Sequence, residues 1–474
     1  MSSLPNVLIL VMDTTRAQNL SCYGYERATS PNLDALAADS VLYEQAIAPG
    51  CWSLPSQMSL LTGLFPAKHG AHELHLTYPH HYPTMPEVLR ETGYTTFGVS
   101  PNSWMSDEFG TTYGFDTYLK MWQFWPTLPA TAEARSRPWI RFAYRLNRFY
   151  TRYRFPKRNR ARHVNQALYN LLDNAREPFF GYVIYWDTHL PYYAHGKHAT
   201  RWLPPGVDLE RAHQVDRDHL AYHTGQLSMT EEDFEILRAC YDGALASIDE
   251  EIGYLVDSLQ QRGILDRTLL IVTSDHGENI GEHSLMSHAY SLHDTLIHVP
   301  LMIRYPACFA RGNRVSSHVQ LTDIFPTLLD ALELEVPEVR AELQGVSLLG
   351  DQPDAADRLA YSEMLSPHPS IPALNRRAGL PEDTPQPRHD RSLRCIRTPE
   401  SKFIWSSDGQ HALYDLRQDP SEMTNLYPEQ AEAAAMLEKH LLSWQPPAGL
   451  PLSAPELHMD EDVRQRLRDL GYID

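Results

Sequence analysis

Three nearly unbroken apolar runs stand out along the chain, at residues 5–12, 178–185 and 269–274. None alternates between apolar and polar positions, as a strand with one wet face would. Continuous runs of this kind are typical of strands buried on both faces, as in a parallel sheet covered by helices. All three end abruptly in polar residues. The pattern therefore predicts three buried strands with chemistry-bearing side chains at their carboxyl ends.

Other periodicities predict the elements around these strands. Apolar residues recur at helical spacing from Glu231 to Arg262, and Gly263 follows as a helix terminator. Residues 41–48 and 94–100 predict further strands. Residues 392–406 and 411–416 predict short antiparallel strands with a turn at 408–409, and the proline-rich residues 365–391 predict a long loop. A length of 474 residues suits one large α/β domain with a smaller appendage, or two to three domains.

The polar residues after the buried strands are candidates for a site. Asp13 follows the first strand, His189 the second, and Asp275 and His276 the third. A carboxylate so placed can hold a hard cation, although an aspartate that merely begins a turn is the alternative. Neighbouring carboxylate and imidazole groups can reach one metal ion, and an imidazole can protonate a leaving alkoxide or contact an anion. Asn102 follows the strand at 94–100 and is a candidate for substrate contact.

The segment 51–63, CWSLPSQMSLLTG, predicts the start of a helix. Pro55 suits the first helical position, and Leu60 and Leu61 provide a buried face. Ser53 would then lie at the helix N-terminus, where unpaired N–H groups and the helix dipole favour an anion. A hydroxyl in this position can attack a phosphorus or sulfur centre. The alternative interpretation is an ordinary N-cap serine.

Composition and charge narrow the class of protein. The formal net charge of −19 argues against general nucleic-acid binding. The run at 7–12 is too short for a signal peptide or a membrane span. Five cysteines, widely spread and without a C-x-x-C pair, favour reduced thiols over a disulfide framework. We therefore predict a cytoplasmic protein without a transmembrane segment.

A basic segment interrupts this acidic chain. Residues 135–162 contain eleven lysines or arginines and no acidic residue, with arginines at helical spacing interleaved with aromatic residues. The pattern predicts a basic amphipathic helix within an insertion at about 119–165. Such a helix can contact an anionic membrane, an acidic polymer or an acidic neighbouring subunit, so a homo-oligomer is one expectation. The alternative is a helix that covers the protein's own acidic surface.

The run Ser53-Leu54-Pro55-Ser56-Gln57, with Leu60-Leu61-Thr62-Gly63, resembles the signature of the sulfatase family, within the alkaline phosphatase superfamily. That signature reads C-x-P-S-R, four further residues and T-G, and its cysteine is oxidised to a formylglycine nucleophile. This chain has Ser53 and Gln57 at the cysteine and arginine positions. Because the maturation enzyme reads the arginine, these departures argue against formylglycine at residue 53.

The resemblance implies an alkaline-phosphatase-like α/β fold, with a large, mixed but mostly parallel sheet between helices. It implies a catalytic domain over residues 1–350 and a smaller C-terminal subdomain with an antiparallel sheet over 351–474. It also implies one divalent cation, held by Asp13, Ser53, Asp275 and His276. The implied catalytic residues are Ser53, His189, His288 and Lys68, and the implied substrate contacts are His69, Asn102 and Gln57. Thr14 stands where the family often has a second metal-binding aspartate.

These features predict a metal-dependent ester hydrolase that forms a covalent intermediate on Ser53. A serine sulfate lacks the hemiacetal collapse by which formylglycine releases sulfate, so phosphate diesters or phosphonate monoesters are favoured over sulfate esters. The alcohol would be a small molecule or a glycan, and the cation Mn²⁺, Zn²⁺ or Ca²⁺. The alternatives are a formylglycine sulfatase, a phospho- or sulfotransferase, and an inactive anion-binding pseudo-enzyme.

Overall fold

The computed structural model describes residues 4–124, 160–350, 358–444 and 459–469, except positions 383, 385, 387 and 388. Most of the basic segment 135–162 lies outside these residues, so its predicted helix and its partners remain predictions. The predicted domain boundary adjoins residues 351–357, which are also outside the described part, and it too remains a prediction. No helix in the described part of the chain combines the length and the apolar character that crossing a membrane requires.

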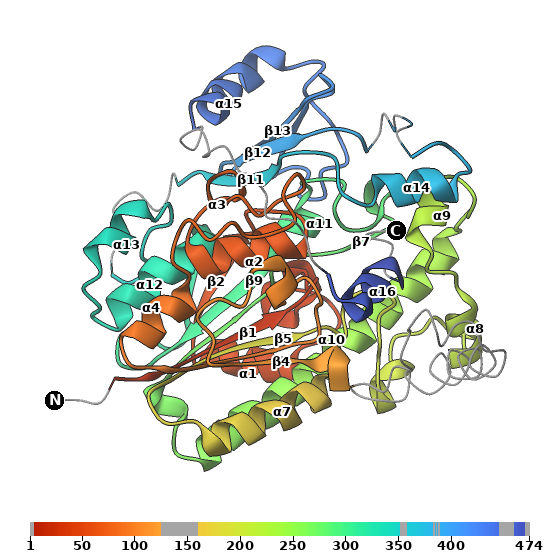
Figure 1. Cartoon of the computed structure of the whole chain (residues 1–474). Coiled ribbons are helices and arrows are strands. Elements are labelled where there is room, and N and C mark those ends of the chain that lie inside the picture. The colour runs from red at the N-terminus through yellow and green to blue at the C-terminus, as the bar shows by residue number, and fades with distance from the viewer. Residues whose placement is uncertain are drawn as a thin grey trace.

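An eight-stranded sheet forms the centre of the molecule (Figure 1). Its strand order is β10-β2-β9-β6-β1-β5-β3-β4. Only the pairs of β9 with β2 and with β6 are antiparallel, which confirms the predicted mixed, mostly parallel sheet. The strands span β1 (Asn6–Met12), β2 (Val41–Ile47), β3 (Thr95–Ser100), β4 (Thr117–Lys120), β5 (Phe179–Tyr185), β6 (Thr268–Thr273), β9 (His298–Arg304) and β10 (Asn313–Gln320).

The three predicted buried strands are the three central ones, with β1 between β5 and β6. Every residue of these strands is buried. Successive side chains of β1 alternate between two apolar cores, with Val7, Ile9 and Val11 on one face and Leu8, Leu10 and Met12 on the other. An uninterrupted apolar run is therefore what a strand needs when helices cover both faces of its sheet.

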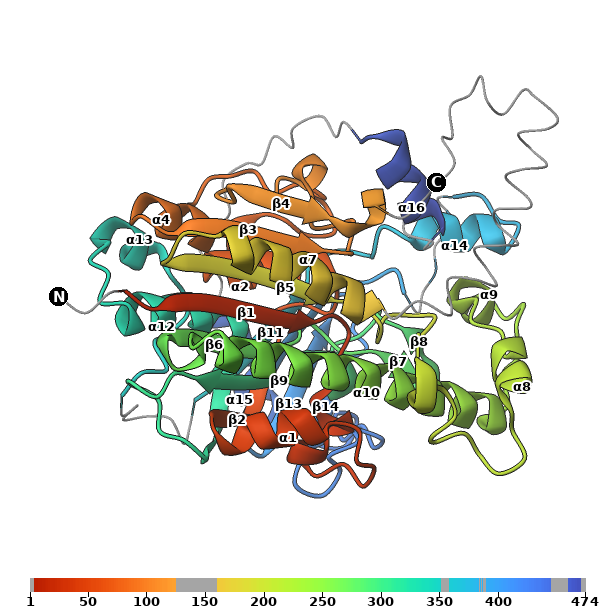
Figure 2. The same ribbon diagram turned by 90° about the horizontal axis from the view of Figure 1, so that it is seen from below.

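Helices cover each face of this sheet, as the two views show (Figures 1 and 2). One layer contains α2 (Ser53–Thr62), α4 (Met85–Glu91) and α12 (Ile324–Ala331), and the other contains α1 (Pro31–Ala38), α7 (Arg160–Asn174) and α10 (Glu231–Gln261). The helix predicted at residues 231–262 is α10, and it ends just before Gly263, whose φ of +67° favours glycine. The other α-helices within the described residues are α3 (Pro66–His69), α8 (Leu209–Gln214), α9 (His219–His223), α11 (Asp294–Ile297), α13 (Pro337–Glu342), α14 (Ile371–Arg377), α15 (Ala431–Ser443) and α16 (Glu461–Asp469).

A smaller antiparallel sheet lies in the C-terminal part of the chain, and α15 packs on it (Figure 1). Its strands pair in chain order, β11 (Ala360–Met364), β12 (Leu393–Arg397), β13 (Ser401–Ser406) and β14 (Ala412–Asp415). β7 (Asn279–Ile280) and β8 (Met286–Ser287) form a separate two-stranded ribbon. The predicted loop at 365–391 contains α14, because Ile371 and Leu374 pack against Leu285 and Tyr290.

A buried group of charged side chains joins the small sheet to the start of α11. The ammonium group of Lys402 on β13 lies 2.8 Å from Asp294 Oδ1 and 2.6 Å from Glu422 Oε1. Arg397 Nη2 on β12 lies 2.9 Å from the other oxygen of Asp294. Burial by itself would raise the pKa of Asp294, but Arg397 and Lys402 hold that pKa well below its usual range.

Replacing Lys402 with methionine is expected to lower the free energy of unfolding by about 3–5 kcal/mol, because Glu422 loses its buried ammonium partner and Asp294 keeps only Arg397. Urea denaturation at neutral pH measures this loss, with Lys439→Met on the exposed face of α15 as the control. The contribution of Asp294 should be complete above the ordinary carboxyl pKa and be lost as the pH falls through its lowered folded-state value. Equal stability of the two variants would contradict the prediction.

Candidate active site

Four predicted residues meet at the carboxyl ends of the central strands. Asp13 follows β1, Asp275 and His276 follow β6, and Ser53 begins α2. Because β1 and β6 are neighbouring parallel strands, their ends lie side by side. Ser53 Oγ lies 3.2 Å from His276 Nε2, and ligand atoms of Asp13, Asp275 and His276 all lie within 4.8 Å of one another. All four side chains are buried.

The cluster has the chemistry of a cation site. Burial, and then the charge of Asp275, raise the pKa of Asp13 well above its usual value. Asp13 Oδ1 is buried and has no hydrogen-bond partner among the described residues. His276 Nδ1 donates to the carbonyl of Gly277 at 2.8 Å, so the other ring nitrogen, Nε2, faces Ser53. Two adjacent buried carboxylates and this imidazole therefore fit a divalent metal ion.

Asn102, a predicted substrate contact, forms hydrogen bonds with the nucleophile candidate and with Asp13. Its Nδ2 donates to Ser53 Oγ at 2.9 Å and to Asp13 Oδ2 at 2.6 Å. Its Oδ1 accepts from the backbone N–H of Trp104 at 3.0 Å, which fixes the orientation of the amide. Helix α2 begins at Ser53, two positions earlier than the start predicted at Pro55, and Trp52 is its N-cap. Ser53 is therefore not an N-cap serine.

Gln57, at the position of the signature's arginine, links two strands of the sheet. Its Nε2 donates to Asp275 Oδ2 at 2.8 Å, and its Oε1 accepts from the hydroxyl of Tyr182 on β5 at 3.1 Å. The amide is fully buried. Its polar atoms thus bond to other protein groups and support Asp275, and the substrate contact of Gln57 stays a prediction.

The structure does not bring Lys68 and His69 to this cluster. Both lie on α3, beyond the C-terminal end of the helix that Ser53 begins. The ammonium group of Lys68 bonds to Glu342, through its carbonyl at 2.6 Å and its carboxylate at 3.0 Å. His69 Nε2 lies 3.0 Å from Ser59 Oγ and 3.1 Å from the carbonyl of Pro55, along the body of α2. We therefore leave both residues out of the proposed site.

His189 and His288 do lie beside the cluster. The ring centroid of His288 is 4.6 Å from that of His276 and 5.1 Å from that of His189. Burial lowers the pKa of His189 to about 3. Burial, and then the nearby His276, lower the pKa of His288 well below its usual value. Both imidazoles are therefore neutral at pH 7 before an anion binds.

Two further side chains, outside the predicted set of site residues, lie next to the site. Arg16 is buried and forms two hydrogen bonds with Glu282, at 2.8 and 3.0 Å, so its charge is compensated within the protein. His368 packs its ring 4.8 Å from that of Trp52, although it belongs to the C-terminal part of the chain. No local pattern marked His368, because it lies in a segment predicted to be an irregular loop.

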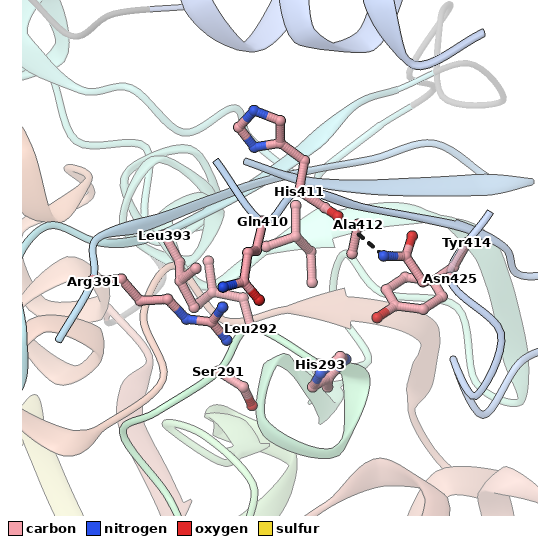
Figure 3. Close-up of a pocket in the computed structure, with 11 residues that line it drawn as sticks. Ser291, Leu292, His293, Arg391, Leu393, Gln410, His411, Ala412, Tyr414 and Asn425 are labelled. Carbon is pink, nitrogen blue, oxygen red and sulfur yellow. Dashed lines mark hydrogen bonds between the residues drawn. The ribbon is translucent and has the colours of Figure 1, made fainter. Parts of the chain in front are cut away.

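A second group of potential ligands, His283, His293 and Glu422, suits a cation less well. The two imidazoles stack nearly parallel, with centroids 3.6 Å apart and planes 9° apart, so their in-plane lone pairs do not converge on one point. Lys402 also occupies one oxygen of Glu422. His293 lines a cavity of about 220 Å³ beside the small sheet (Figure 3), and no residue of the Ser53 cluster lines that cavity.

A buried hydroxyl beside carboxylate and imidazole groups, at the carboxyl ends of a mostly parallel sheet, is an arrangement that suits an ester hydrolase. The sequence profile of the sulfatase family matches residues 5–334, and the chain belongs to this family.

Similar proteins cover nearly the whole chain. Arylsulfatase K of Bos taurus is 26% identical over 466 residues, covering 93% of this chain and 81% of its own. Choline-sulfatase of Rhizobium meliloti (strain 1021) is 25% identical over 445 residues, covering 89% and 82%. The crystal structure of the phosphonate monoester hydrolase of Agrobacterium radiobacter superimposes with a TM-score of 0.68, at 24% identity, over 93% of this chain and 95% of that chain. This last similarity establishes the shared fold.

Proposed function

We propose that this protein hydrolyses esters of a phosphorus or sulfur oxyacid through a covalent intermediate on Ser53. The observation that carries the proposal is the position of Ser53 Oγ, 3.2 Å from His276 Nε2 and 2.9 Å from Asn102 Nδ2 in a buried cluster. The N–H groups and dipole at the start of α2 favour an anion beside this hydroxyl.

Asp13, Ser53, Asp275 and His276 would hold one divalent cation, Mn²⁺, Zn²⁺ or Ca²⁺. When bound, such an ion lowers the pKa of a ligating hydroxyl and stabilises charge on the transferred group. Asn102 holds Asp13 and Ser53 together through one amide nitrogen. The Nδ1–H bond of His276 to Gly277 fixes the ring so that Nε2 faces the cluster.

In the proposed first step, Ser53 Oγ forms a bond to phosphorus or sulfur, and the bond to the ester oxygen breaks. His288 or His189 passes the hydroxyl proton to the departing alkoxide. Both rings are neutral in the free protein, and a bound anion raises the pKa of a neighbouring imidazole. Water then attacks the serine ester and releases the oxyacid anion and Ser53.

The charges of the described residues favour a transferred group with a single negative charge. Gln57 and Thr14 are neutral at positions where the family often has charged residues. The positive charge of Arg16 is compensated by Glu282, and that of Lys68 is compensated by Glu342. We therefore favour phosphate diesters and phosphonate monoesters of a small-molecule or glycan alcohol. Sulfate esters, which are also singly charged, are the second candidate, and membership of the sulfatase family supports them.

A panel of aryl esters that differ only in the transferred group tests this proposal. We expect kcat/KM for the diester or the phosphonate monoester to exceed that for the doubly charged phosphate monoester by at least about 10²-fold, a difference of about 2.7 kcal/mol in transition-state binding. A preference for the phosphate monoester would contradict the charge argument. Exclusive turnover of the aryl sulfate would favour the sulfatase alternative, and turnover only with an added acceptor alcohol would favour a transferase.

A further inference from the structure

Trp52, directly before Ser53, is enclosed by aromatic and acidic side chains. It is fully buried, and two other rings contact its ring nearly edge-on. The centroid of Trp104 is 5.2 Å away at an interplanar angle of 77°, and that of His368 is 4.8 Å away at 84°. The indole Nε1 donates to Glu73 Oε1 at 2.8 Å. Edge-to-face contacts and a buried hydrogen bond together restrict the side chain to one orientation.

Trp104 connects Trp52 to the proposed nucleophile, Ser53, through Asn102. The backbone N–H of Trp104 donates to Asn102 Oδ1, and Asn102 Nδ2 donates to Ser53 Oγ. Ser53, Trp52, Trp104 and Asn102 therefore form a closed circuit of one covalent link, one ring contact and two hydrogen bonds. A movement of Trp52 would disturb Ser53 through the backbone and through Asn102.

Residues of the C-terminal part of the chain also hold Trp52 in place. The backbone N–H of Leu365 donates to Glu73 Oε2 at 3.1 Å, so the carboxylate bridges Leu365 and Trp52. His368 Nδ1 lies 2.9 Å from Ser370 Oγ, and that hydroxyl lies 2.6 Å from the hydroxyl of Tyr290. These contacts anchor the His368 ring, which is itself buried.

We propose that Trp52 is a positioning residue for Ser53 and that His368 holds Trp52 in its productive orientation. The segment that follows β11 would thus help to complete the active site by positioning Trp52. This inference rests on the proposed function of Ser53. Without the His368 ring, Trp52 has space to rotate and to shift the start of α2. A displacement of about 1 Å at a reacting group can lower a rate by about 10²-fold.

Two substitutions at one position test the inference. His368→Ala is expected to lower kcat by at least about tenfold while KM changes less than about twofold, because the hydroxyl is misaligned but binding contacts persist. His368→Phe keeps an aromatic edge against Trp52 and should restore kcat to within about threefold of the parent. His318→Ala is the matched control. His318 is also buried, but it lies on the edge strand β10, where its ring bonds to the carbonyl of Arg358. Its kcat should equal that of the parent even where its melting temperature falls.

Hydrogen exchange provides a readout that does not depend on activity. Amides of residues 52–57, apart from Pro55, should exchange at least about tenfold faster in His368→Ala than in the parent, with β1 unchanged. Unchanged exchange in this segment, faster exchange that extends to β1, or faster exchange with an unchanged kcat would each overturn the inference. If the parent turns over no ester of the panel, the proposed function fails, and the exchange experiment still decides whether His368 holds the start of α2.

Discussion

Replacing Ser53 with alanine is expected to lower kcat/KM by about 10⁴–10⁶-fold, the range seen when the nucleophile of a covalent hydrolase is removed. The loss follows because the described cluster is built around this hydroxyl, which receives a hydrogen bond from Asn102 and faces His276. Steady-state kinetics with the preferred ester of the panel measures the effect. Rapid quenching of the parent should also reveal Ser53 carrying the transferred group by mass.

Ser59→Ala is the matched control, because Ser59 is a buried serine of the same helix whose hydroxyl contacts His69. It should retain activity within a few-fold of the parent. Full activity of Ser53→Ala would contradict the nucleophile assignment. An intact mass that is two hydrogens short at residue 53, together with turnover of sulfate esters, would identify a formylglycine sulfatase with an unusual maturation signature.

Removal of divalent metal is expected to abolish activity and to lower the melting temperature. The physical reason is that Asp13 and Asp275 are fully buried next to each other, so a cation that binds only the folded state offsets their repulsion. A metal present at 100 times its Kd contributes about 2.7 kcal/mol to the free energy of unfolding. Elemental analysis, calorimetry after dialysis against a chelator, and restoration with Mn²⁺, Zn²⁺ or Ca²⁺ measure these effects.

Asp275→Asn keeps the size of the side chain and removes one charge, so we expect substoichiometric metal and a loss of activity comparable to that of chelation. Asp242→Asn is the control. Asp242 is likewise buried, but it accepts hydrogen bonds from Asn19, Tyr25 and Arg27 and lies outside the cluster. Its metal content should equal that of the parent. A purified parent protein that lacks metal and keeps its activity in chelator would contradict the proposed cation.

Local sequence patterns predicted the centre of the fold. The unbroken apolar runs identified β1, β5 and β6, because a strand covered by helices on both faces excludes polar side chains along its length. The polar residues after these strands, Asp13 and Asp275 among them, then had to meet, since neighbouring parallel strands end at the same edge of a sheet. The position of Ser53 at the start of a helix followed from the residues after it.

By itself, then, the sequence determined the central strands and the placement of Asp13, Asp275 and His276 at their carboxyl ends, because regular strands extend local periodicity into space. That Ser53 joins these residues was implied by the resemblance to the sulfatase signature. Only the tertiary structure decided which neighbours surround that cluster. It directed Lys68 away towards Glu342, and it brought His368 against Trp52 from the far part of the chain. Such contacts join segments that are far apart in the sequence. They depend on how side chains fill the space between packed elements, and no local sequence pattern predicts this.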